Sequence, residues 1–194
     1  DDPGGVRATI GAMNTVVRAP DGGLLGTNTD AAGFFGPISD KDWSVSTVAI
    51  VGAGGAARSI LFALAQVGVG SVALYCRNTL RGSALLAGFG LKGRVLPLET
   101  PMVAADLLVN ASPLGMKGAA AYAPDLSALP DHAIVYDIVY APLVTPLLAA
   151  ARARGLETVD GLEMLVGQAA VAFELFFGQP PPDDDARLRA RLLA

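Results

Sequence analysis

The chain has 194 residues, enough for one large domain with a buried core. Because 52% of them are hydrophobic and only 16% are charged, the composition excludes intrinsic disorder. A net charge of −4 provides no basic field for a nucleic-acid backbone, and no apolar run reaches the roughly 20 residues of a membrane span.

The single cysteine, Cys76, and the single histidine, His132, exclude an internal disulfide and a protein-built metal site. The first residues carry neither the basic start nor the apolar stretch of a signal peptide. We therefore expect a cytoplasmic protein with small-molecule ligands and with neither nucleic-acid nor membrane partners.

The first 40 residues predict a β-hairpin and a short helix. Two β-runs, residues 12–18 and 24–26, flank a turn signal at residues 21–23. A helix is expected from Asp30, with Thr29 or Asp30 itself as the cap of its free N–H groups.

From residue 44 onward, buried strands alternate with amphipathic helices, which is typical of a parallel sheet covered on both faces. Gly68, Gly88 and Gly155 stand where helices commonly end. We expect an α/β fold, a Rossmann-type doubly wound sheet. Its expected strands are residues 48–51, 71–75, 94–97, 107–110, 134–137 and 157–159, and its expected helices are 56–67, 80–87, 144–153, 161–177 and a tail helix ending at Ala194.

A glycine-rich segment follows the first buried strand and opens a helix. It has the G-x-G-x-x-A form of the dinucleotide fingerprint: Gly52 permits a tight turn, Gly54 lets the backbone approach a pyrophosphate, and Ala57 lets the helix pack on the strand. The helix N-terminus then offers free N–H groups to the phosphates. Although glycines can mark only a turn, this order predicts a nucleotide site that includes Gly52, Ala53, Gly54, Gly55 and Ala56.

The end of the second buried strand indicates which nucleotide. An NAD site places a carboxylate there, whereas residues 76–81 contain no acid and two arginines, Arg77 and Arg81, one helical turn apart. Both could hold a 2′-phosphate by charge-assisted hydrogen bonds, with Asn78 as a further donor. The alternative is a solvated basic loop. We predict NADP as the cofactor rather than NAD.

Three polar residues, Asn14, Asp30 and Gln168, have no evident role in packing a hydrophobic core. Asn14 could be an ordinary strand-edge residue, and Asp30 could serve only the helix start. Gln168, however, lies among apolar neighbours, where an amide needs a hydrogen-bond partner. We expect the three to face a common polar site.

The chain resembles the shikimate dehydrogenase family in six motifs that occur in the family's order. The motifs are GAMNTVV at residues 11–17, GTNTD at 26–30, the glycine loop at 52–57, NASPLGM at 110–116, DIVY at 137–140 and DGLEMLVGQAA at 160–170. The resemblance implies an NADP-binding Rossmann domain at residues 31–160. Residues 1–30 and 161–194 would then be parts of a second α/β domain that binds substrate.

The resemblance also implies an activity, the reversible NADPH-dependent reduction of 3-dehydroshikimate to shikimate on the way to chorismate and the aromatic amino acids. Asp30 would be catalytic, and Asn14, Tyr140 and Gln168 would join it in binding the substrate. The implied cofactor positions are Gly52, Ala53, Gly54, Gly55, Ala56, Cys76, Arg77, Asn78, Arg81, Ser112, Ile138 and Gly161.

One family feature has no counterpart in these residues. Family members carry a serine pair and a catalytic lysine in an N-terminal segment, whereas Lys41, Lys92 and Lys117 stand in no such context and are expected as surface charges. A carbonyl reduction needs a proton donor or a cation at the oxygen. We therefore expect little or no turnover from these 194 residues alone. We also expect an exposed apolar surface that favours self-association, as in a homodimer, or binding of a partner fragment.

Three alternatives stay open. A quinate-preferring relative would share the motifs, and a non-catalytic NADP-binding module would explain the missing lysine. A folate-linked or glutamyl-tRNA-linked dehydrogenase of similar architecture fits the motifs at residues 26–30 and 161–168 poorly.

Overall fold

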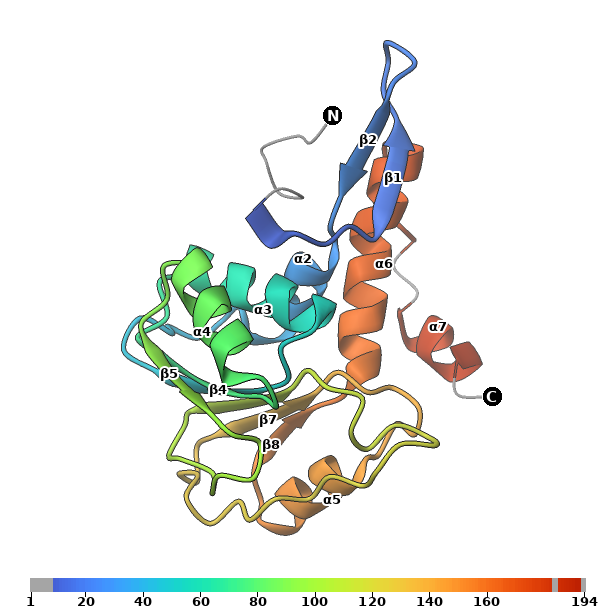
Figure 1. Ribbon diagram of the computed structural model, residues 1–194. Coiled ribbons are helices and arrows are strands. Elements are labelled where there is room, and N and C mark those ends of the chain that lie inside the picture. The colour runs from blue at the N-terminus through green and yellow to red at the C-terminus, as the bar shows by residue number, and fades with distance from the viewer. Residues whose placement is uncertain (1–8, 183–184, 193–194) are drawn as a thin grey trace.

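The computed structural model describes residues 9–182 and 185–192. Its centre is a six-stranded sheet in the order β5-β4-β3-β6-β7-β8, in which every neighbouring pair is parallel. This confirms the expected Rossmann-type α/β fold (Figure 1). The strands are β3 (Thr47–Val51), β4 (Ser71–Tyr75), β5 (Gly93–Leu96), β6 (Leu107–Asn110), β7 (Ile134–Asp137) and β8 (Glu157–Val159).

Helices cover both faces of this sheet, so its central strands are buried throughout. All four residues of β6 and of β7 are buried, as parallel strands between two helical layers require. One face packs against α2 (Asp30–Phe35), α3 (Gly55–Gln66) and α4 (Thr79–Gly88), and the other against α5 (Pro146–Ala153) (Figure 1).

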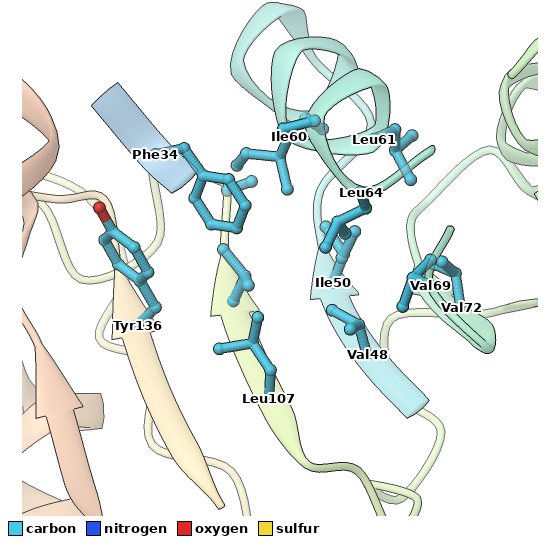
Figure 2. Packing of buried hydrophobic residues seen from close by; sticks show 14 of the residues in the cluster. Phe34, Val48, Ile50, Ile60, Leu61, Leu64, Val69, Val72, Leu107 and Tyr136 are labelled. Carbon is cyan, nitrogen blue, oxygen red and sulfur yellow. The ribbon is translucent and has the colours of Figure 1, made fainter. Parts of the chain in front are cut away.

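The core between the sheet and helices α2 and α3 is closely packed. Ile60 and Leu64 of α3 lie over Ile50 of β3, and all three are fully buried (Figure 2). Phe34 of α2 stacks on Tyr136 of β7, with ring centroids 5.1 Å apart. Each such side chain contributes about 1.5–3 kcal/mol through burial, so α2 is fixed firmly on the sheet.

A long helix connects the sheet to a separate hairpin. The hairpin strands β1 (Thr15–Arg18) and β2 (Leu24–Thr27) pair antiparallel. Helix α6 (Gly161–Phe177) starts at the sheet and runs up to the hairpin, and α7 (Asp185–Leu192) lies beside it (Figure 1). Arg189 of α7 forms ion pairs with Asp160 at 3.0 Å and Glu163 at 2.8 Å, both at the start of α6. In the described part of the chain, no helix has the length and hydropathy of a membrane span.

Several predicted element ends are wrong, each for a local reason. The first strand begins at Thr15 rather than residue 12, because the paired register starts at Thr15 opposite Thr27, where β2 ends. The Asn14 amide still donates to the Thr27 carbonyl at 3.2 Å. The strand β5 ends before Pro97, which has no N–H to donate. Helix α5 begins at Pro146, not residue 144, because the Thr145 hydroxyl caps it by accepting from the Leu148 amide. The predicted tail helix is described as far as Leu192, and residues 193–194 lie outside the described part.

Candidate functional site

The carboxyl ends of β3, β4 and β6 open into a pocket of about 470 Å³. The chain order reverses between β3 and β6, and ligands of doubly wound sheets bind at such a switch point. Gly52 forms its floor with a φ of +112°, and a Cβ there would lie 2.6 Å from the Ala111 carbonyl oxygen. Glycine is therefore required, and it keeps the start of α3 close to the strand ends.

Basic and neutral donors line the β4 side of the pocket. Arg77, Asn78 and Arg81 are exposed and border it. The Asn78 side chain accepts from the Arg81 amide at 2.9 Å, so it caps α4 and fixes the helix that carries Arg81. Cys76 forms a buried wall, and desolvation raises the pKa of its thiol, so it stays neutral.

A buried polar network shapes the opposite wall. Asp137 is fully buried and accepts from Asn110 at 2.9 Å, from the Val139 amide at 3.1 Å and from the Thr145 hydroxyl at 2.6 Å. Burial raises the pKa of Asp137, and these three donors oppose that rise. Asn110 also accepts from Ser112 and donates to the carbonyl of residue 114. The network thereby sets the loop at residues 112–114, which lines the pocket.

The pocket meets the chemical requirements of a phosphorylated dinucleotide. The α3 N-cap is Gly54, and a Cβ built there would meet no atom within 4 Å. The backbone N–H groups at the start of the helix are therefore accessible to a pyrophosphate. The guanidinium groups of Arg77 and Arg81 lie at the end of β4, where the 2′-phosphate of NADP would lie. Residues 76–81 contain no carboxylate that would repel it. The donor set therefore fits NADP.

A second polar cluster joins the hairpin, α2 and α6. The Asn14 side-chain nitrogen donates to Asp30 Oδ1 at 2.8 Å and to Gln168 Oε1 at 3.0 Å. Asn14 Oδ1 accepts from the Thr29 amide at 2.9 Å, which fixes the orientation of the amide group. The three residues expected to share a polar site are thus in contact.

The expected helix cap is wrong. Thr29 occupies the N-cap position of α2, but its hydroxyl interacts with Asn14 instead of the helix. The Asn28 side chain accepts from the Asp30 amide at 3.1 Å in its place. The Asp30 carboxylate therefore does not cap α2 and instead accepts a hydrogen bond from Asn14.

The cluster keeps polar atoms available for a ligand. Within the described residues, Asp30 Oδ2 and the Gln168 side-chain nitrogen have no hydrogen-bond partner, and Gln168 is only half-buried. One acceptor and one donor therefore point away from the Asn14 contacts. No lysine of the described part joins them there: Lys41 pairs with Glu157 at 2.9 Å, and Lys92 and Lys117 are exposed.

Helix α6 links the cluster to the pocket side of the sheet. Gly161 begins it, and a Cβ there would lie 2.4 Å from the Ile138 carbonyl oxygen. Gln168 stands seven residues further, about 10 Å along the axis. Tyr140 remains apart from the cluster: it is 56% exposed, and no hydrogen bond joins it to the cluster among the described residues.

Comparisons with known proteins agree with this arrangement. A family description, the Shikimate 5′-dehydrogenase C-terminal domain, matches residues 161–187. The shikimate dehydrogenase (NADP(+)) of Sphingopyxis alaskensis is 62% identical over 195 residues, covering 100% of this chain and 71% of the relative. The chain belongs to the shikimate dehydrogenase family.

Two solved structures of related enzymes share the fold. The shikimate 5-dehydrogenase of Thermus thermophilus in complex with NADP(H) and shikimate is 37% identical, with a TM-score of 0.81 over 96% of this chain and 70% of that one. The quinate dehydrogenase of Corynebacterium glutamicum in complex with NAD is 35% identical, with the same TM-score of 0.81 over 96% of this chain and 69% of that one.

Two features of the site escaped the sequence reasoning. The sequence did not predict the Asp137 network, because Asn110 lies 27 residues before Asp137 and each of Asn110, Asp137 and Thr145 also suits an ordinary strand end or helix cap. The close contact of Gly33 with Gly167 was also missed. A glycine inside a helical pattern was the available signal for it.

Proposed function

We propose that this chain binds NADP in the pocket at β3, β4 and β6 and interconverts shikimate and 3-dehydroshikimate at the Asn14–Asp30–Gln168 cluster. The contact of these three side chains, drawn from the hairpin, α2 and α6, carries the proposal. In this proposal residues 1–30 and 161–194 form the substrate side of the protein, and residues 31–160 form the cofactor side. Residues 1–8, 183–184 and 193–194 of the substrate side lie outside the described part.

Two arginines and accessible backbone N–H groups support the assignment of the cofactor side. Arg77 and Arg81 would hold the 2′-phosphate, and the N–H groups that follow Gly54 would hold the pyrophosphate. Ser112, Ile138 and Gly161 would line the way toward the substrate. Bound NADPH supplies the hydride that reaches the carbonyl carbon.

The substrate side is assigned by its free donors and acceptors. A polyhydroxylated ring with a carboxylate needs several hydrogen-bond partners, and a site that hydrogen-bonds those groups rejects analogues that lack them, because its own polar groups are then left unpaired. Gln168 offers N–H donors, and Asp30 Oδ2 offers an acceptor to the reacting hydroxyl. We also propose that Tyr140 contacts the substrate, because the residue is 56% exposed.

The proton needs a second group beside Asp30. Negative charge grows on the substrate oxygen as hydride arrives, and a carboxylate cannot donate to it. The Asp30 carboxylate would instead accept a hydrogen bond from the reacting hydroxyl of the substrate and stabilise a neighbouring cation. Since no lysine contacts it among the described residues, we expect little or no turnover.

Calorimetric titration of NADP, NAD, shikimate and quinate, followed by an assay of NADPH formation, tests the proposal. NADP should bind more tightly than NAD, and shikimate more tightly than quinate, with Asp30→Asn lowering turnover further. Binding of NADP without shikimate would favour a non-catalytic module, and a preference for quinate would favour the quinate dehydrogenases.

We also propose that the chain forms a homodimer through the apolar end of α6. Phe176 and Phe177, adjacent residues at the end of α6, are 55% and 64% exposed. Apolar groups gathered on a surface favour association. Sedimentation should show a dimer that Phe176→Ser with Phe177→Ser converts to a monomer; a wild-type monomer would refute this part.

A further inference from the structure

The substrate cluster lies beside a crossing of α2 and α6 at which two glycines meet. Gly33 of α2 is buried against the turn of α6 that precedes Gln168. A Cβ on Gly33 would lie 2.5 Å from the Gln168 amide nitrogen and 2.7 Å from the Met164 carbonyl oxygen. Both are backbone atoms of a helix, so neither can turn aside.

The second glycine faces the first. A Cβ on Gly167 would lie 3.1 Å from the Gly33 Cα and 3.3 Å from its carbonyl oxygen. The two helices therefore touch through their backbones. Since Gly33 follows Asp30 by one helical turn and Gly167 directly precedes Gln168, this contact sets the separation of the two side chains that Asn14 joins.

We propose that Gly33 and Gly167 are positioning residues for substrate binding and that their contact sets the geometry of the Asn14–Asp30–Gln168 cluster. This inference rests on the proposed function of that cluster. An alanine at position 33 must move α6 away by about 1 Å to reach an ordinary van der Waals separation.

Such a movement breaks the cluster but spares the cofactor pocket. Asn14 binds Asp30 at 2.8 Å and Gln168 at 3.0 Å, so an added shift of about 1 Å takes at least one of these bonds beyond hydrogen-bond length. No residue that lines the pocket lies on α2 or α6. Of the proposed cofactor positions only Gly161 lies on α6, at its first residue, about 9 Å along the axis from Gly167. Substrate and cofactor affinity should therefore respond differently.

The test compares three alanine variants of the full chain: Gly33→Ala, Gly167→Ala and Gly36→Ala. Gly36 is the matched control, because it lies just after α2 and a Cβ there meets nothing within 4 Å. Titration calorimetry measures the affinities for shikimate and NADP. Side-chain amide NMR signals of Asn14 report the cluster directly, without any turnover.

The expected result is a graded loss. Gly33→Ala should weaken shikimate binding about 100-fold, Gly167→Ala by several-fold, and Gly36→Ala not at all, with NADP affinity within about twofold of wild type in each. The Asn14 signals should shift in the first two variants only. If Gly33→Ala does not fold, the shikimate affinity and the Asn14 signals of the milder variant, Gly167→Ala, provide the test.

Two results would overturn the inference. Parallel loss of NADP and shikimate affinity would mean a general folding defect, and unchanged Asn14 signals in Gly33→Ala would mean that the crossing does not set the cluster. Failure of the wild-type chain to bind shikimate would instead count against the proposed function, and the Asn14 signals would still test the crossing.

Discussion

The two sites of this chain are built in opposite ways. The cofactor pocket lies on strands that are almost wholly buried, and its shape is set by backbone contacts such as that of Gly52. The substrate cluster lies where α6 meets the hairpin, and only three of the 17 residues of α6 are buried. A single asparagine links its members. The buried strands therefore hold the pocket in place, whereas the cluster should fail after shifts of about 1 Å.

Loss of both pocket arginines should give the largest effect. Each charge-assisted hydrogen bond contributes about 1.5–3 kcal/mol, so Arg77→Ala with Arg81→Ala should weaken NADP binding by about 100-fold or more. NAD affinity should change little, because it has no 2′-phosphate. Calorimetry with both nucleotides measures the loss of NADP affinity against that of NAD affinity. Arg94→Ala, which removes an exposed arginine on β5, is the control. Equal losses for NAD and NADP would disprove the assigned role.

Removal of the Asp137 carboxylate should cost the most stability. Asp137→Ala leaves donors of Asn110, Val139 and Thr145 without their buried acceptor, which should lower the free energy of unfolding by about 3 kcal/mol or more. NADP affinity should fall as well, because the loop at residues 112–114 loses its anchor. Urea unfolding measures the first effect. The exposed Asp131→Ala serves as the control, and an unchanged midpoint for Asp137→Ala would contradict the account.

Truncation of Asn14 isolates the substrate cluster. Asn14→Ala removes the link between Asp30 and Gln168, and one hydrogen bond to a carboxylate corresponds to roughly a tenfold or larger loss of shikimate affinity. NADP affinity should stay the same. Calorimetry with the neighbouring Met13→Ala, which removes an exposed side chain, gives the comparison. If Asn14→Ala weakens NADP binding as much as shikimate binding, the two sites are not separate.

Removal of the hydrogen bond between His132 and Asp106, which lie just before β7 and β6, should give the smallest change in stability. Partial burial raises the pKa of Asp106, but hydrogen bonds from His132 and the Thr47 amide outweigh it, so the net pKa is lowered. A lowered folded-state pKa adds stability above the unfolded value near about 3.9, and that stability is lost as the pH falls below it. His132→Ala should lower the free energy of unfolding near pH ~5 by less than about 1 kcal/mol.

The pH dependence of this difference checks the assignment. Thermal unfolding of wild type and His132→Ala should differ near pH ~5, and the difference should shrink as the pH falls and the Asp106 carboxylate becomes protonated. A difference that grows on acidification would show that another group is responsible.

The sequence predicted the sheet better than the sites. Strands at residues 71–75, 107–110, 134–137 and 157–159 match the structure, because buried parallel strands are continuous apolar runs. The glycine loop and the two arginines line the pocket, and both could be singled out from residues that are neighbours in the chain; their role in cofactor binding stays a prediction. Contacts between distant segments, such as Gly33 with Gly167, leave no periodic pattern and had to come from the structure.

A crystal structure of this chain grown with NADP is the most direct test of the central claim. The account predicts the 2′-phosphate between Arg77 and Arg81, the pyrophosphate at the start of α3, and the nicotinamide end directed past Gly161 toward Asp30. Cofactor density elsewhere, or both guanidinium groups turned away from the phosphate, would contradict it.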